Sequence, residues 1–122
     1  MKRIIIGITG ATGTIYGWRL MEMLREEGDT EIHLVMSAAA KLTLKMEHDV
    51  DPDYINSLAH EVHSPGNIGA SISSGSFSSV GMIIAPCSIK TMSNIAMGNT
   101  GDLISRAADV ILKERRKLII AI

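Results

Sequence analysis

Short apolar runs alternate with segments of helical periodicity along the whole chain. The first run, Arg3 to Thr9, contains consecutive isoleucines, and unbroken β-branched residues are typical of a parallel strand covered on both faces. Similar runs at Glu31 to Met36 and Met82 to Pro86 predict two more buried strands, and Leu118 to Ile122 predicts a fourth. These runs predict the strands of one sheet.

Helical patterns fill the intervals between these strands. Apolar residues recur at helical spacing after the first strand, at Tyr16, Leu20, Met23 and Leu24, and Gly28 is placed to end that helix. A second helix is expected from Ala38 to about Glu47, where Leu42 and Met46 lie four residues apart. Asp51 and Pro52 are typical of the N-cap and first residue of a short helix.

Two further helices are expected in the second half of the chain. One runs from Ser88 to Met97, where Gly98 can end it, and the other begins after Asp102 as its cap. The expected buried positions of the last helix are Leu103, Ala107, Val110 and Ile111. Between the elements, Ser64 to Ser79 is rich in glycine and serine, which predicts a long loop, and long loops are often functional.

The alternation of strands and helices predicts an α/β fold. In this three-layer fold, a mainly parallel sheet lies between two layers of helices. The connections between its parallel strands are right-handed crossovers. A chain of 122 residues fits one domain, residues 1–122. Because the chain stops inside an apolar strand, at Ile122, we expect that this domain lacks its C-terminal segment.

Composition excludes several classes of function. A net charge of -1 gives no electrostatic footprint for nucleic acid, and no apolar run is long enough for a membrane span. Cys87 is the only cysteine, which excludes an internal disulfide and favours the cytoplasm. The four histidines, His33, His48, His60 and His63, show no metal-ligand spacing, so we expect packed or surface histidines and no metal.

A glycine-rich loop follows the first strand. Gly7, Gly10 and Gly13 are spaced three apart, and small residues allow backbone N–H groups to approach an anion at a helix N-terminus. Three hydroxyls of the same segment add possible donors: Thr9, Thr12 and Thr14. The spacing is not that of a dinucleotide fingerprint, and no acidic residue follows the second strand, so NAD binding is disfavoured. A tight turn without any ligand remains the alternative.

A second corner of the same kind lies at Pro86 to Thr91. Ser88 and Thr91 can donate hydrogen bonds there, and Ser37 is placed similarly after the second strand. Ligands of open α/β sheets sit beyond the carboxyl ends of the strands, where these segments should meet. Ser88 has a second interpretation, because serine is a common helix N-cap whatever the helix binds.

Together these motifs resemble the flavin prenyltransferases of the UbiX type. The segments that carry the resemblance are Gly7 to Gly13, Ser37, Pro86 to Thr91 and Arg106 to Glu114. Within that family, His63 to Pro65 and Ile72 to Phe77 are most similar to the B subunits of bacterial hydroxyarylic acid decarboxylases. The resemblance implies a flavodoxin-like, Rossmann-like fold. It covers the chain essentially from end to end.

The resemblance also implies an activity. Family members join a dimethylallyl group from dimethylallyl phosphate to reduced FMN, giving prenylated FMN for a partner decarboxylase of the UbiD type. No metal is implied, and a homo-oligomer is expected because relatives build the site between subunits. The family continues beyond the position of Ile122 with further site residues, which lie outside these 122 residues.

Site residues follow from the resemblance position by position. The residues expected to hold FMN are Gly10, Ala11, Thr12, Ser37, Ser88, Ile89, Lys90 and Thr91. Glu47 aligns with a family carboxylate that manages a proton near the prenyl phosphate, and the Thr12 hydroxyl would lie near the reacting flavin edge. Arg106 and Lys113 align with phosphate contacts. Taken alone, Glu47 is better explained as a solvated glutamate at a helix end, and Lys113 is explained equally well as a surface charge.

Two alternative functions remain open at this point. The chain could bind FMN without turning it over, because the C-terminal part of the family site lies outside it. It could also be related to FMN-dependent cysteine decarboxylases. Ile89 and Lys90 in the second corner, and Tyr16 after the first loop, depart from the pattern of those enzymes.

Overall fold

A five-stranded parallel sheet forms the centre of the molecule. The computed structural model describes all of residues 1–122. Its strands are β1 (Lys2–Ile8), β2 (Thr30–Met36), β3 (Glu61–His63), β4 (Gly81–Ile84) and β5 (Lys117–Ile120). They pair in the order β3-β2-β1-β4-β5, with every neighbouring pair parallel. The predicted α/β fold with a mainly parallel sheet is therefore confirmed.

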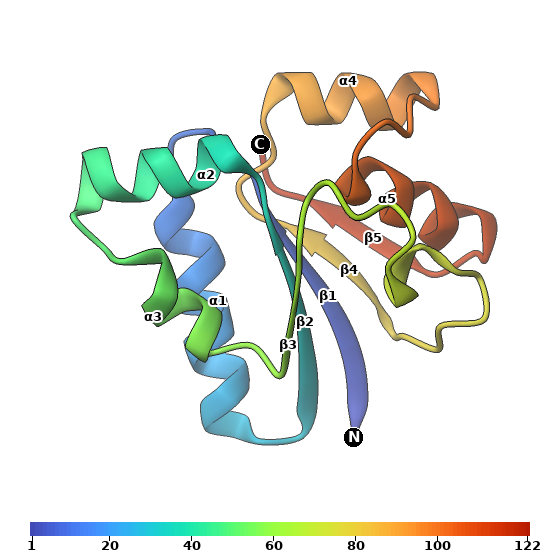
Figure 1. Ribbon diagram of the computed structural model, residues 1–122. Coiled ribbons are helices and arrows are strands. Elements are labelled where there is room, and N and C mark those ends of the chain that lie inside the picture. Colours follow the sequence, from blue (N-terminus) through green and yellow to red (C-terminus); the bar gives the residue numbers. More distant parts are fainter.

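Helices cover both faces of the sheet (Figure 1). They are α1 (Thr14–Glu27), α2 (Ala38–Thr43) with its π-helical extension η1 (Leu44–His48), α3 (Pro52–Ser57), the 3-10 turn η2 (Ser71–Ser73), α4 (Ile89–Met97) and α5 (Leu103–Lys113). One face carries α1, α2 and α3, and the other carries α5, with α4 beside α5. None of these helices is both long and apolar enough to cross a membrane.

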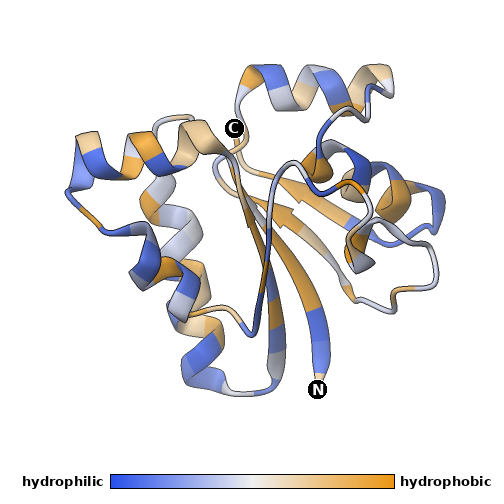
Figure 2. Cartoon of the chain, in the orientation of Figure 1, coloured by the Kyte–Doolittle hydropathy of each residue, from blue (hydrophilic) through white to orange (hydrophobic).

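Two apolar clusters fill the space between these layers. Under α1, α2 and α3, the cluster includes Ile6, Leu34 and Met21, all fully buried. On the other face, Ile5 and Met82 of the sheet pack against α5. Figure 2 shows the strands as the most continuously apolar part of the chain, as expected for a sheet covered on both faces.

The predicted helix boundaries agree closely with the structure. Gly28 and Gly98 adopt the left-handed conformation that ends α1 and α4. Asp51 accepts a hydrogen bond from the Asp53 N–H at the start of α3, and Asp102 accepts one from the Ser105 N–H at the start of α5. These local caps were readable because each depends on residues close together in the chain.

In two helices, several of the residues with apolar helical spacing lie outside the buried face. Tyr16 and Met23 of α1 are exposed, and the residues of α1 that are buried are Thr14, Gly17, Trp18 and Met21. Gly17 lies against the Ala85 carbonyl and Ile8. Because glycine has no side chain, α1 packs closely against these residues at this position. In the second helix, Leu42 and Met46 are exposed, whereas Ala40 and Leu44 are buried. Val110 of α5 is only partly buried.

The strand β3 was not predicted at all. It has three residues and pairs only with β2, so its apolar pattern is too short to detect. Leu118 to Ile122 was expected as the fourth strand and forms the fifth, β5. The long loop from Ser64 to Ser79 contains only the turn η2, through which Ile72 enters the core.

Candidate functional site

A cleft of about 500 Å³ opens at the carboxyl ends of the central strands. Its lining residues are Thr9, Gly10, Ser37, Ala38, Ala39, Pro65, Gly66, Ser88, Lys90, Thr91, Asn94, Asp102 and Ile104. The loop after β1 faces the starts of α2 and α4 here. In the sheet, β1 lies between β2 and β4, and α2 and α4 follow these two strands in the chain. This is the topological switch point at which open α/β sheets bind ligands.

Thr9 holds the two halves of the cleft together. Its Oγ1 donates a hydrogen bond to the Pro86 carbonyl at 2.8 Å and accepts one from the Ser88 N–H at 2.7 Å. The expectation that Thr9 offers its hydroxyl to an anion is therefore wrong, since both hydrogen-bonding directions are used within the protein. Thr14 is also fully buried, and Thr12 is the exposed threonine of this segment.

Helix N-termini supply the polar groups of the cleft. The Ser88 Oγ accepts a hydrogen bond from the Thr91 N–H at 3.2 Å and lies 3.0 Å from the Thr91 Oγ1, to which it donates. The Ser37 Oγ accepts one from the Ala40 N–H at 3.1 Å. Both serines are thus N-caps that also line the cleft. Ser88 can therefore be a helix cap and a cleft residue at the same time. The N-terminus of α4 lines the same cleft through Ser88, Lys90 and Thr91, and helix N-termini favour an anion.

Gly10 makes the close packing of this site possible. A Cβ at Gly10 would overlap the Ala39 Cβ and lie 3.0 Å from the Ala39 backbone carbon. Without a side chain, the Gly10 backbone faces the cleft directly. Gly13, the N-cap of α1, has a φ of 101°, a conformation that favours glycine.

The predicted cofactor residues divide into two groups. Five of them line the cleft: Gly10, Ser37, Ser88, Lys90 and Thr91. The others, Ala11, Thr12 and Ile89, are neighbours in the chain that do not line it, and Ile89 is exposed. Sequence reasoning missed Asn94, Asp102 and the pair Pro65 and Gly66 as lining residues. Only the glycine-rich and serine-rich composition of their loop had suggested a role for the last two.

The predicted catalytic and phosphate-binding residues do not line this cleft. Glu47 lies in η1 with a side chain 44% exposed, and its Oε2 is 3.9 Å from the His48 Nε2. Lys113 forms an ion pair with Asp109 on the same helix, Nζ to Oδ2 at 2.9 Å. Arg106, one turn into α5, has a buried Nε without a hydrogen-bond partner. Their roles in catalysis and phosphate binding stay predictions.

Cys87 lies beside the cleft as a buried thiol. Its side chain is 1% exposed, and burial raises its pKa above the ordinary value. A neutral thiol is a poor nucleophile, so Cys87 fits the role of a small core residue, as the sequence predicted. The chemistry of the cleft therefore rests on hydroxyls, backbone N–H groups, Lys90 and Asp102.

Comparison with known proteins shows the family to which this chain belongs. A family model described as Flavoprotein matches residues 1–122. The chain belongs to the Flavoprotein family. This family member is 53% identical over 122 residues to flavin prenyltransferase UbiX of Escherichia coli K12, a match covering 100% of the chain and 65% of that relative. The chain thus spans slightly less than two thirds of the length of that curated relative.

Solved structures extend the similarity to three dimensions. The structure of AnUbiX (PadA1) in complex with FMN and dimethylallyl pyrophosphate superimposes with a TM-score of 0.95 and 47% identity, covering 98% of this chain and 63% of that one. A dodecameric FMN-dependent UbiX-like decarboxylase from Escherichia coli O157:H7 gives a TM-score of 0.94 at 47% identity, over 97% of this chain and 64% of that one. The cleft thus lies in a fold closely shared with FMN-binding proteins.

Proposed function

We propose that this Flavoprotein family member binds FMN in the cleft between the β1 loop and the starts of α2 and α4. The observation that carries the proposal is the convergence of Gly10, Ser37 and Ser88 on one cleft at the sheet's switch point. Its volume of about 500 Å³ lies within the range of small-molecule sites. The Gly10 backbone lines the cleft without a side chain, so the cofactor can approach it closely.

Each part of the cleft has a role in this proposal. The first-turn N–H groups of α4 and the Thr91 hydroxyl, which the Ser88 Oγ orients by donating to it, hydrogen-bond the FMN phosphate, and Lys90 adds a positive charge. Ser37 and Gly10 position the rest of the cofactor. Thr9 directly follows β1 and keeps the two corners at a fixed separation, because its hydroxyl bonds to Pro86 and Ser88 after β4. Because this frame is already rigid, less conformational entropy is lost when the cofactor binds.

We propose further that the protein acts as a flavin prenyltransferase, joining dimethylallyl from dimethylallyl phosphate to reduced FMN. The support is the 53% identity with UbiX of Escherichia coli K12 and the similarity to a structure holding FMN and dimethylallyl pyrophosphate. Reduced FMN, when bound, supplies the nucleophilic ring atoms that accept the dimethylallyl group. Glu47 would hold or release a proton at the reacting centre, Thr12 would place its hydroxyl near the flavin, and Arg106 and Lys113 would hold the prenyl phosphate.

The direct experiment uses the 122-residue chain, reduced FMN and dimethylallyl phosphate without oxygen. Mass spectrometry should detect prenylated FMN, and dimethylallyl pyrophosphate should be compared as an alternative donor. Replacing Glu47 with glutamine should lower kcat by about 10²- to 10⁴-fold, the usual range for loss of a general acid or base. Glu26→Gln, another exposed glutamate, is the matched control and should leave kcat unchanged. Equal rates in both variants would remove Glu47 from the mechanism.

A second candidate is an FMN-binding protein without prenyl transfer. The placement of Glu47, Arg106 and Lys113 outside the cleft lining favours it. Stoichiometric FMN binding by a folded sample that forms no prenylated product would select this candidate. Absence of FMN binding would reject both functions at once.

Two partners belong to the prenyltransferase proposal. A UbiD-type decarboxylase would receive the product, and activation of such an apo-enzyme by the reaction mixture tests this. Homo-oligomerisation is also proposed, because large apolar side chains such as Met46 and Met97 are exposed and a similar structure is dodecameric. Sedimentation of the purified chain measures the oligomeric state. We place the protein in the cytoplasm, whose reducing conditions suit its one cysteine.

A further inference from the structure

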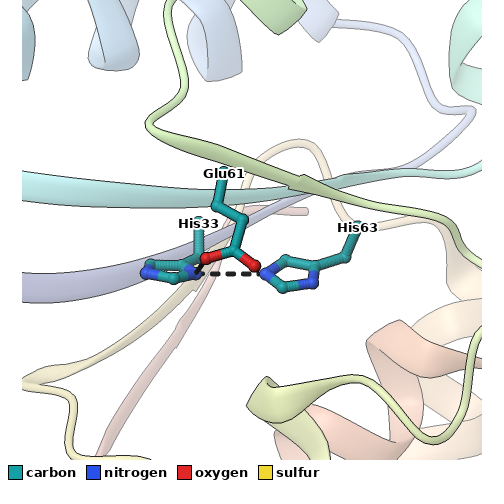
Figure 3. Close-up of side chains that lie close together, drawn as sticks. All are labelled: His33, Glu61 and His63. Atoms are coloured by element: carbon teal, nitrogen blue, oxygen red, sulfur yellow. Dashed lines mark hydrogen bonds and ion pairs between the residues drawn. The ribbon is translucent and has the colours of Figure 1, made fainter.

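Two buried histidines and a glutamate meet at the edge of the sheet, away from the cleft. Figure 3 shows the side chains of His33, Glu61 and His63 converging, with the imidazoles joined by a hydrogen bond. The His33 Nδ1 lies 3.1 Å from the His63 Nε2 and 3.6 Å from the Glu61 Oε2. One possible ligand atom from each residue lies within 4.8 Å of the others.

Strand pairing explains why these residues meet. In the parallel ladder of β2 and β3, His33 is opposite Glu61 and Val35 is opposite His63. Opposed residues share a face, and residues two apart on a strand share it too, so all these side chains point the same way. Phe77, from the long loop, packs edge-on against the His33 ring. The cluster is therefore held by the sheet and enclosed by this loop.

The hydrogen bonding of His33 suits a metal ligand. The His33 Nε2 lies 2.7 Å from the Glu31 Oε1, and a proton on this nitrogen leaves the Nδ1 lone pair directed toward His63. A carboxylate behind a ligating histidine is a common feature of metal sites, where it fixes the tautomer and orients the ring.

The spacing also suits a small tetrahedral ion. Ligand atoms about 2.0 Å from a tetrahedral zinc ion lie about 3.3 Å from each other. The observed separation between the His33 Nδ1 and the His63 Nε2 is 3.1 Å. A cation would take the place of the proton shared by the two rings. Two imidazoles favour zinc-type ions over magnesium or calcium, which prefer oxygen ligands.

We propose that His33, Glu61 and His63 form a binding site for a zinc-type divalent cation. Glu61 is exposed, with 57% of its side chain accessible, so the site opens to solvent on its side and water can complete the coordination. The bound ion would join β3, a strand of only three residues, to the neighbouring β2. None of its ligands lines the cleft, so this site is distinct from the proposed FMN site.

The test measures zinc binding by untagged protein freed of metal with a chelator. Competition with a chromophoric zinc indicator should give one zinc ion per chain, and zinc should raise the Tm. His63→Gln should abolish this binding, and Glu61→Gln should weaken it by at least tenfold. Cobalt should give the absorption bands of tetrahedral coordination in the wild type. Glu61 is exposed, so its variant should fold, and circular dichroism checks both proteins.

His60→Gln is the matched control. His60 lies one residue before β3 and outside the cluster, where its Nδ1 accepts a hydrogen bond from the Ile32 N–H. Glutamine can accept the same bond, and this variant should keep wild-type zinc affinity. The proposal is overturned if the folded wild type binds no more zinc than His63→Gln, or if His60→Gln loses as much affinity as Glu61→Gln.

Discussion

At the scale of single residues, two side chains at the cleft do something other than their type suggests. The hydroxyl of Thr9 serves as a bridge within the protein, with hydrogen bonds to Pro86 and Ser88. Cys87 follows the same pattern, because burial makes it a packing residue and raises its pKa. The type of a residue limits its chemistry, and its neighbours then decide which part of that chemistry is used.

Gly10→Ala should disturb the cleft more than an ordinary surface substitution. The new Cβ would overlap Ala39, so the β1 loop or α2 must shift. Overpacking of this kind costs about 1 to 3 kcal/mol, and FMN affinity should fall at least tenfold. Chemical denaturation and FMN titration measure the two effects. Gly101→Ala, where a Cβ meets nothing within 4 Å, is the control, and equal losses in both variants would contradict the steric explanation.

The Cys87 thiol should react slowly in the folded protein. Its side chain is buried and its pKa is raised, so little thiolate forms near pH 8 and reagents reach it poorly. Alkylation should be at least tenfold slower than in protein unfolded by urea. Because the folded pKa lies above the unfolded one, any contribution of this thiol to stability is lost as the pH rises through the folded pKa. Labelling at the unfolded rate would show that the thiol is accessible.

At the scale of elements, N-caps connect stability with the candidate site. Ser88 caps α4 beside the cleft, whereas Asp51 caps α3 away from it. Either cap is worth about 1 kcal/mol, because its loss leaves a helical N–H group without a partner. The two caps therefore separate structural from binding effects.

Ser88→Ala should lower both stability and FMN affinity. The lost hydroxyl bonds the Thr91 N–H and also faces the cleft, so we expect a loss of about 1 kcal/mol of stability and a tenfold or greater drop in affinity. Asp51→Ala should lose similar stability and keep its FMN affinity. Urea denaturation and fluorescence titration compare them. An unchanged affinity in Ser88→Ala would remove that hydroxyl from the proposed site.

At the scale of the whole molecule, the strands differ in how firmly they are held. β1 is paired on both sides, with β2 and β4, whereas β3 is a short edge strand paired only with β2. Local opening requires little free energy where few contacts must break. The molecule should therefore open first at β3.

Hydrogen exchange should follow this order. In metal-free protein, amides of β1 at Ile5 and Ile6 should exchange at least a hundredfold more slowly than those of β3 at Val62 and His63. The fully buried β1 core, with Ile6 at 0% exposure, must open globally, whereas β3 can separate from β2 alone. Exchange followed by mass spectrometry or NMR measures the ratio. Similar rates in the two strands would mean that β3 opens only with the whole sheet.

The sequence alone determined the local features of this protein. Apolar runs, cap residues and terminating glycines act over a few neighbouring residues, so they predicted β1, β2, β4, β5, the five α-helices and the glycine loop. The resemblance then pointed to FMN and to Ser37 and Ser88, which both line the cleft. A lone glutamate or lysine such as Glu47 or Lys113 carries no such local signal, and its role came from resemblance alone.

The tertiary structure decided what depends on contacts between distant parts of the chain. Pairing of β2 with β3 brought His33 to His63, which lie 3.1 Å apart although no spacing along the chain linked them. Packing also selected Gly17 and Met21 over Tyr16 and Met23 as the buried positions of α1. Periodicity places residues around a helix, but the shape of the opposing surface determines which side of that helix is buried.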